Sequence, residues 1–287
     1  MKIFVSGAGT MIGNNICKEL INNNHRVVGG YHKTKPNTLK SKTLKFNLNN
    51  KIKFNFKFDC LVHCASAIPS YNLNSAEMIK TNYHGFKKIL KEAKKCGCKK
   101  IILISSTSIY GEIKKKKLEE SHKKNPKDGY GISKLMMEKY LIKFCKENNL
   151  VYKIYRLSNV VGKNSKHNFL SNVLQNIKHR RKVYFSNPNL KFNNLFHVDN
   201  LKKIVLKSVL DNQNEIYNLG TRRPIKLINI IKYIYRNFKE NENFYVVKKN
   251  SNIGYNLLLS TKLKKKYKIY STIETIKLFV KQNKYKI

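Results

Sequence analysis

A tyrosine and a lysine stand four positions apart in the segment Tyr130-Gly-Ile-Ser-Lys134, which opens a strongly helical stretch. Residues at i and i+4 share a helix face, so the lysine ammonium can favour the phenolate and lower the tyrosine pKa. Ser106 follows the apolar run 101–105 and can hydrogen-bond a reacting oxygen. The three residues predict general acid–base chemistry at a hydroxyl or ketone. For the Tyr–Lys motif alone, a chance pair on an exposed helix is the alternative.

A glycine-rich turn follows the first apolar run, residues 2–6. Glycines allow a tight turn and a close approach of the backbone to a pyrophosphate, whose charge sits at the N-terminus of the next helix. Thr10 stands where a middle glycine is expected, and Gly9 can compensate. The turn therefore predicts a dinucleotide site that consists of Gly7, Gly9, Thr10, Met11, Ile12 and Gly13.

Apolar strand patterns alternate with helical patterns through the first half of the chain. This alternation predicts βαβ units, and hence an α/β fold with a Rossmann-type, doubly wound parallel sheet. Helical patterns occupy 75–96 and 130–148, besides the helix that ends at 22–24. Strand patterns occupy 2–6, 25–30, 42–46, 60–64, 101–105 and 151–156.

The pattern becomes less regular beyond residue 160. We expect residues 1–160 to form a NAD(P)-binding Rossmann domain. Residues 161–287 would form mostly a small C-terminal substrate-binding lobe, with some segments returning to the main domain. Helices are predicted near 169–181, 199–211, 225–238 and 271–284, with a strand at 215–220.

The formal charge is +43, from 59 basic and 16 acidic residues. A nucleic-acid binder gathers its cations into a patch, often rich in arginine and stacking aromatics. Here the excess is almost all lysine and runs from end to end, as expected from a compositional bias at exposed positions. We therefore predict no specific nucleic-acid partner, and an exposed loop at the densest run, Lys114–Lys117. So positive a surface would speed encounter with anionic substrates such as nucleotide sugars.

The N-terminal segment lacks the basic flank, long apolar core and cleavage site of a signal peptide, and no apolar run is long enough to span a membrane. The six cysteines form no CxxC pair and no zinc-ligand pattern, which indicates reduced thiols and no metal site. A cytoplasmic protein is expected.

Seven segments, in family order, make the chain resemble the extended short-chain dehydrogenase/reductase family, in its sugar-nucleotide epimerase/dehydratase branch. They follow the glycine-rich turn: Asp59-Cys-Leu-Val-His63-Cys64-Ala65-Ser66, Asn82-Tyr-His-Gly85, Ser105-Ser106-Thr107-Ser108-Ile109-Tyr110-Gly111, Tyr130-Gly-Ile-Ser-Lys134, Arg156-Leu-Ser-Asn159-Val-Val-Gly162, His197-Val-Asp199-Asn200 and Tyr217-Asn-Leu-Gly220.

The resemblance implies a role for each matching residue. Tyr130 would be the acid/base, Ser106 the catalytic hydroxyl, and Lys134 would hold the nicotinamide ribose while lowering the Tyr130 pKa. Asn82 would brace the site from a helix. Substrate contacts would come from Ser106, Thr107 and Asn159. The remaining cofactor contacts would be Tyr31, His32, Lys33, Asn47, Leu48, Cys64, Ala65, Ser66 and Asn82, with Tyr130 and Lys134.

Some positions depart from the family pattern. An acid usually ends the second strand and bonds the adenosine ribose, but Tyr31 stands there, followed by His32, Lys33 and Lys35. The cationic segment favours NADP, with NAD as the alternative. Asn47 replaces an adenine-contacting aspartate, and Asn193 or its neighbour replaces an arginine that often contacts the diphosphate.

We expect an NAD(P)-dependent sugar-nucleotide epimerase or keto-sugar reductase. Dehydratases of this family carry an acidic pair after the catalytic hydroxyl, whereas this chain has Thr107 and Ser108, which argues against dehydration. The alternative is a non-catalytic NADP-binding sensor or scaffold on the same fold, although such proteins typically lose the tyrosine or lysine kept here. A homodimer is left open.

Overall fold

The computed structural model describes residues 1–36, 42–113, 117–163, 165–166, 168–238, 244–246 and 255–284. The chain divides into two compact units, and each is described by itself. The first unit comprises Met1–Gly111, Lys123–Arg156 and Leu201–Tyr217; the second comprises Glu112–His122, Leu157–Asn200 and Asn218–Ile287.

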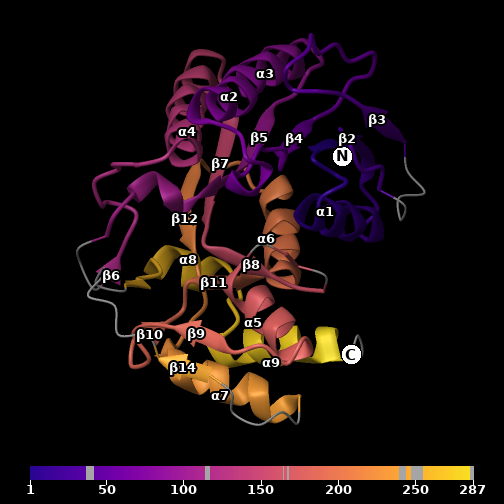
Figure 1. The fold of residues 1–287 in the computed structure, drawn as a ribbon. Coiled ribbons are helices and arrows are strands. Elements are labelled where there is room, and N and C mark those ends of the chain that lie inside the picture. Colours follow the sequence, from indigo (N-terminus) through magenta and orange to yellow (C-terminus); the bar gives the residue numbers. More distant parts are fainter. Residues whose placement is uncertain are drawn as a thin grey trace. The chain divides into compact units, whose positions relative to one another are not determined.

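A seven-stranded sheet with the order β12-β7-β5-β4-β1-β2-β3 forms the centre of the first unit (Figure 1). The paired strands from β3 to β5 run parallel, so their carboxyl ends meet at one edge. This architecture confirms the predicted Rossmann-type α/β fold. The strands are β1 (Lys2–Ser6), β2 (Arg26–Tyr31), β3 (Thr43–Lys45), β4 (Cys60–His63), β5 (Lys100–Ser106), β7 (Val151–Leu157) and β12 (Glu215–Leu219).

Helices cover both faces of this sheet. Figure 1 shows α2 (Ser75–Ile79), α3 (Gly85–Lys95) and α4 (Gly129–Glu147) grouped together. The other face carries α1 (Met11–Asn22) and α6 (Val198–Leu210), which are joined by an ion pair of 3.1 Å between Lys202 and Glu19.

The single helix predicted over 75–96 is in fact interrupted. A π-helical turn at Lys80–His84 separates α2 from α3, and Asn82 is buried in it. Such turns are frequent at functional sites because they re-aim a side chain. Helical periodicity continues through the turn, so the sequence pattern did not reveal the break.

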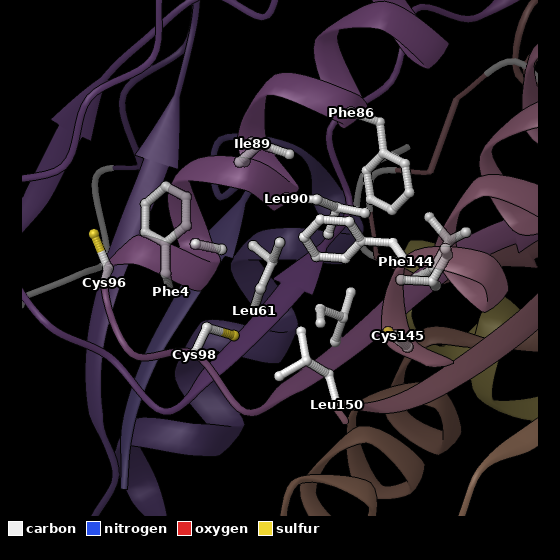
Figure 2. Close-up of a cluster of buried hydrophobic side chains, with 14 of the residues drawn as sticks. Phe4, Leu61, Phe86, Ile89, Leu90, Cys96, Cys98, Phe144, Cys145 and Leu150 are labelled. Carbon is white, nitrogen blue, oxygen red and sulfur yellow. The ribbon is translucent and has the colours of Figure 1, made fainter. Parts of the chain in front are cut away.

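The core on the α3/α4 face explains why these elements form (Figure 2). Phe4 and Leu61 are register partners on β1 and β4, and both side chains are fully buried. They pack in one cluster with Phe86 and Ile89 of α3 and Phe144 of α4. Alternate strand residues point to the opposite face, which is buried as well. The near-continuous apolar runs of the strands follow from this two-sided burial.

The second unit has its own apolar cluster, formed mainly by helices α5 (Phe169–Lys178), α7 (Leu227–Asn237) and α9 (Thr272–Lys284). Its described strands pair two by two and have only two or three residues each, too few for an alternating pattern, and sequence reasoning missed most of them together with α8 (Thr261–Lys266). The pairs are β8 (Asn159–Val161) with β11 (Leu195–His197), β9 (Val183–Phe185) with β14 (Phe244–Val246), β10 (Lys191–Phe192) with β13 (Ile225–Lys226), and β6 (Lys117–Leu118) with β15 (Asn256–Leu257).

One local prediction is wrong. Lys117 begins β6 and pairs with Asn256, so it does not lie in a loop. The remainder of that run, 114–116, lies outside the described residues. The lysine charges hid the strand because the only buried side chain of β6 is Leu118.

Among the described helices, none combines the length and apolar character that crossing a membrane requires. All six cysteines belong to the first unit and carry free thiols.

Truncating Leu61 should destabilise the first unit strongly. Leu61→Ala removes a fully buried side chain from the cluster of Figure 2, which typically costs about 2–5 kcal/mol of unfolding free energy. Urea unfolding measures this cost. The control is Leu210→Ala, whose side chain is 64% exposed at the end of α6. Equal losses in the two variants would contradict the core described here.

Candidate active site

The glycine-rich turn connects β1 to α1, as predicted. Gly7 adopts a φ of 75°, and a Cβ there would lie 2.7 Å from the Ala65 amide nitrogen, so only glycine fits. Thr10 is the N-cap of α1: its Oγ1 accepts from the Gly13 N–H at 3.1 Å and donates to the Gly7 carbonyl at 2.7 Å. Thr10 therefore closes the turn in place of a middle glycine. The first-turn N–H groups have no intrahelical acceptors and suit a phosphate.

The cationic segment after β2 lies beside this turn. A Cβ on Gly9 would collide with the Thr34 carbonyl oxygen, so the two backbones are in close contact. Tyr31 ends β2 half-buried, whereas His32, Lys33 and Lys35 are exposed. Their cations are thus available to an anionic group next to the turn.

Two further predicted residues follow β3. Asn47 is half-buried, and its side-chain carbonyl accepts from the Asn49 N–H at 3.0 Å. Leu48 is buried in the core, and Gly85 packs closely against it. Leu48 thus anchors this segment to α3.

Asn82 braces the loop that follows β4. Its side-chain oxygen accepts from the Ala67 N–H at 2.7 Å and from the Ser66 hydroxyl at 3.1 Å. Its amide group donates to the Ala67 carbonyl and to the Ser133 hydroxyl, each at 3.0 Å. Ser133 donates in turn to the Tyr130 carbonyl at 2.7 Å. The π-helical turn therefore ties the Cys64–Ser66 loop to the first turn of α4.

Ser106, Tyr130 and Lys134 come together at the carboxyl end of β5. Tyr130 is half-buried, and the Ser106 hydroxyl, which bonds Ser108, lies close enough to influence the Tyr130 phenol. The Lys134 Nζ lies 5.6 Å from the centre of the Tyr130 ring and donates to the Ile104 carbonyl at 3.0 Å. The residues predicted to act together are therefore adjacent.

The pKa values correct one expectation. Burial raises the pKa of Tyr130 to about 12, while the neighbouring Ser106 hydroxyl acts in the opposite direction. Burial therefore outweighs the lowering expected from Lys134, and the net shift of the Tyr130 pKa is upward. The same burial lowers the pKa of Lys134 to about 8, and interactions with Cys64 and then Glu138 oppose that shift.

Sequence reasoning missed a hydrogen-bonded pair below the loop. The Ser6 hydroxyl lies 2.8 Å from His63 Nδ1 and accepts from the N–H groups of Cys64 and Ala65. With its oxygen engaged in this way, Ser6 donates to Nδ1. Burial and the Lys134 charge lower the pKa of His63 to about 3, so the ring is neutral. His63 stands within the quoted family segment, which was the available signal.

The remaining predicted residues lie elsewhere. Thr107 opens a short 3₁₀ helix, Thr107–Tyr110, and is half-buried. Asn159 belongs to the second unit, is exposed, and donates to the Asn194 carbonyl at 3.1 Å. Asn193 is buried in that unit, and its side chain bonds the backbone of Thr221 and Leu257. Asn193 thus serves the fold. The described residues form no His, Cys, Asp and Glu cluster that could hold a metal ion.

The sequence of this chain is similar to those of known proteins. The model of the NAD dependent epimerase/dehydratase family matches residues 3–220. A putative UDP-glucose 4-epimerase of Methanocaldococcus jannaschii is 27% identical over 286 aligned positions, which cover 88% of this chain and 92% of the relative.

Solved structures show the same fold. The Thermotoga maritima UDP-glucose 4-epimerase with UDP-glucose superposes with a TM-score of 0.82 at 22% identity, covering 100% of this chain and 99% of that one. The Bordetella bronchiseptica enzyme WbmG in complex with NAD has a TM-score of 0.82 at 17% identity, covering 99% and 94%.

Replacing Lys134 by methionine should stabilise the protein at neutral pH. Lys134 is 2% exposed and its pKa falls from 10.5 to about 8, which corresponds to about 3 kcal/mol of unfavourable burial. The lost bond to Ile104 offsets about 1 kcal/mol of the gain. The unfolded state binds the extra proton between pH 8 and 10.5, so wild-type stability rises across that window and the advantage of the variant shrinks.

Thermal or urea unfolding at pH 7 and pH 9.5 measures the effect. Lys139→Met, at an exposed position of the same helix, is the matched control and should change stability little. A Lys134→Met variant less stable than wild type at pH 7 would refute the buried-charge argument.

Proposed function

The chain belongs to the NAD dependent epimerase/dehydratase family, one of the extended short-chain dehydrogenases/reductases, and from this premise we propose that it interconverts 4-epimers of a nucleotide-activated hexose. The observation that carries the proposal is the meeting of Ser106, Tyr130 and Lys134 at the carboxyl end of β5. Relatives named UDP-glucose 4-epimerase support a UDP-sugar as substrate.

Each residue has a chemical role in this proposal. A bound oxidised nicotinamide supplies the hydride acceptor and a positive charge. Tyr130 would take the proton of the sugar hydroxyl as the hydride leaves and a ketone forms, and would return it as the hydride is delivered to the opposite face of the ketone. Ser106 hydrogen-bonds the reacting oxygen together with Tyr130. The Lys134 ammonium holds the cofactor ribose and stabilises the phenolate, which needs help because burial raises the Tyr130 pKa.

Two polar hydroxyls argue against a dehydratase. Thr107 and Ser108 follow Ser106, and neither carries a proton that could be transferred readily at neutral pH. Reduction of a keto sugar is the second candidate, favoured by the cationic segment His32–Lys35, because NADPH commonly serves reductions.

The two units would divide the work. The first unit, with its glycine turn and Cys64–Ser66 loop, would bind the cofactor. The second unit would bind the sugar nucleotide, with Asn159 as one contact. The fit of a dinucleotide rests on the turn, where a side chain at Gly7 has no room and the first N–H groups of α1 have no intrahelical acceptors. Six free thiols suit a reducing compartment such as the cytoplasm, and the homodimer stays a prediction.

Turnover with UDP-glucose or UDP-galactose tests the function. We expect interconversion with no net change in cofactor, whereas one NADPH consumed per product would mean a reductase. Tyr130→Phe should lower turnover by about 10²–10⁴-fold with cofactor affinity nearly unchanged. A Tyr130→Phe variant with more than about a tenth of wild-type activity would exclude Tyr130 as the acid/base. Formation of a 4-keto-6-deoxy sugar would refute epimerisation and reduction together.

The cofactor itself provides a separate test. The family is NAD dependent, and for this chain we propose a preference for NADP, because Lys33 and Lys35 are exposed beside the glycine turn. Titration with both cofactors should give tighter binding of NADP. Lys33→Ala/Lys35→Ala should remove the preference, while Lys139→Ala on α4 should not. Equal affinities of the wild-type protein for NAD and NADP would end this proposal.

A further inference from the structure

A chain of four buried polar side chains adjoins the catalytic residues within the first unit. The Ser105 hydroxyl donates to Glu138 Oε1 at 2.5 Å. Arg156 donates from Nε to both Glu138 oxygens at 3.1 Å, and from Nη2 to Oε2 at 2.8 Å. Its Nη1 donates to the Tyr110 hydroxyl at 2.7 Å. None of these four side chains has a role in the chemistry proposed above.

Contacts between the end of β5 and one face of α4 fix the register of the strand against the helix. Three successive strand residues meet α4 at positions one helical turn apart: Ile104 accepts from Lys134, Ser105 donates to Glu138, and Ser106 lies beside Tyr130. Residues spaced by four lie on one helix face. A displacement of the strand end against the helix would break all three contacts.

Stability alone does not account for the ion pair. Glu138 and Arg156 are 2% and 4% exposed, and a buried pair of this kind can often be replaced by apolar residues without loss of stability. Apolar residues cannot reproduce the directional hydrogen bonds between a guanidinium and a carboxylate, which fix the relative orientation of the two side chains. The Arg156 guanidinium also lies 5.4 Å from the Tyr110 ring centre, at the end of the 3₁₀ helix.

We propose that Glu138 and Arg156 are positioning residues, which hold the end of β5 and the Thr107–Tyr110 helix against α4 so that Ser106 and Lys134 stay in catalytic register. This inference rests on the proposed function. Glu138 acts on Lys134 in a second way, since its negative charge favours the ammonium. The other groups that face Lys134 are Cys64, His63 and Tyr130.

Glu138→Gln tests both effects. The variant keeps the shape of the side chain and removes its charge. We expect a fall in kcat of about 10–100-fold, because small misplacements of reacting groups have effects of this size, with KM for the nucleotide sugar little changed. The Lys134 ammonium should also titrate at a lower pH than in wild type. Lysine side-chain NMR follows this titration, with Lys134→Met identifying the signal.

The matched control is Glu147→Gln, on the same helix, whose carboxylate forms an exposed ion pair with Lys143. It should leave kcat and the Lys134 titration unchanged. If Glu138→Gln fails to fold because Arg156 is left unpaired, the double variant Glu138→Leu/Arg156→Met replaces both charges. The double variant should fold and still lose kcat.

Wild-type kcat in a folded double variant would overturn the positioning role. An unshifted Lys134 titration in Glu138→Gln would overturn the effect of the Glu138 charge on the site. The titration needs no turnover, so it also separates the two ideas. A wild-type protein that converts no nucleotide sugar contradicts the proposed function, while the Lys134 shift still decides whether Glu138 acts on the site.

Discussion

The contact of strand β5 with helix α4 is the constraint on which the site depends. An ammonium must stand beside a phenol at this contact. Burial there disfavours the charged form of both groups, the ammonium and the phenolate. The strand end supplies a carbonyl to Lys134 and a hydroxyl to Tyr130. The apolar faces of β4 and β5 beneath α3 and α4 make this contact rigid, since close-packed side chains resist sliding. Core packing and catalytic geometry are therefore two aspects of one interface.

The burial of Lys134 connects the stability of the protein to its chemistry. Desolvation lowers its pKa to about 8. This value is still above neutral pH, so most of the side chain remains an ammonium. Without nearby negative groups the pKa of this buried lysine would fall further, and the carboxylate of Glu138 is one group that opposes the fall. Because Glu138 is itself paired with Arg156, its effect on Lys134 is weaker than that of an unpaired carboxylate. Glu138 thus raises the pKa of Lys134 without neutralising its charge. A carboxylate in direct contact with Lys134 would neutralise that charge.

The main elements of the first unit could be predicted from the sequence because their patterns are long. Two-sided burial makes β1, β4 and β5 apolar runs, and the YGISK segment fixed Tyr130 and Lys134 on one face. The π-helical turn at Asn82 could not be predicted, since inserting one residue into a helix leaves the apolar spacing readable. The pKa of Tyr130 was misjudged for a related reason: spacing predicts which charge is near, whereas burial depends on the whole fold. Ser105, Glu138 and Arg156 come from three separate elements, so no local pattern joins them.

The scarcity of acids gives the few carboxylates unusual structural weight. The chain has 59 basic residues and 16 acidic ones, so there are too few carboxylates to pair with most of the lysines. Several of the acids occupy places where a charge decides local structure. Asp128 caps α4 by accepting from the Gly131 N–H, and Asp211 and Glu215 neutralise the buried Lys153.

A surface filled with lysine by composition can tolerate this excess, because exposed like charges are screened within about 10 Å at ordinary salt. The interior cannot, because a buried cation without a carboxylate or a carbonyl pays the full desolvation cost. The overall charge of +43 follows from composition, whereas the buried acids stand where a buried cation needs a partner, as Glu138 does for Arg156 and Glu215 does for Lys153.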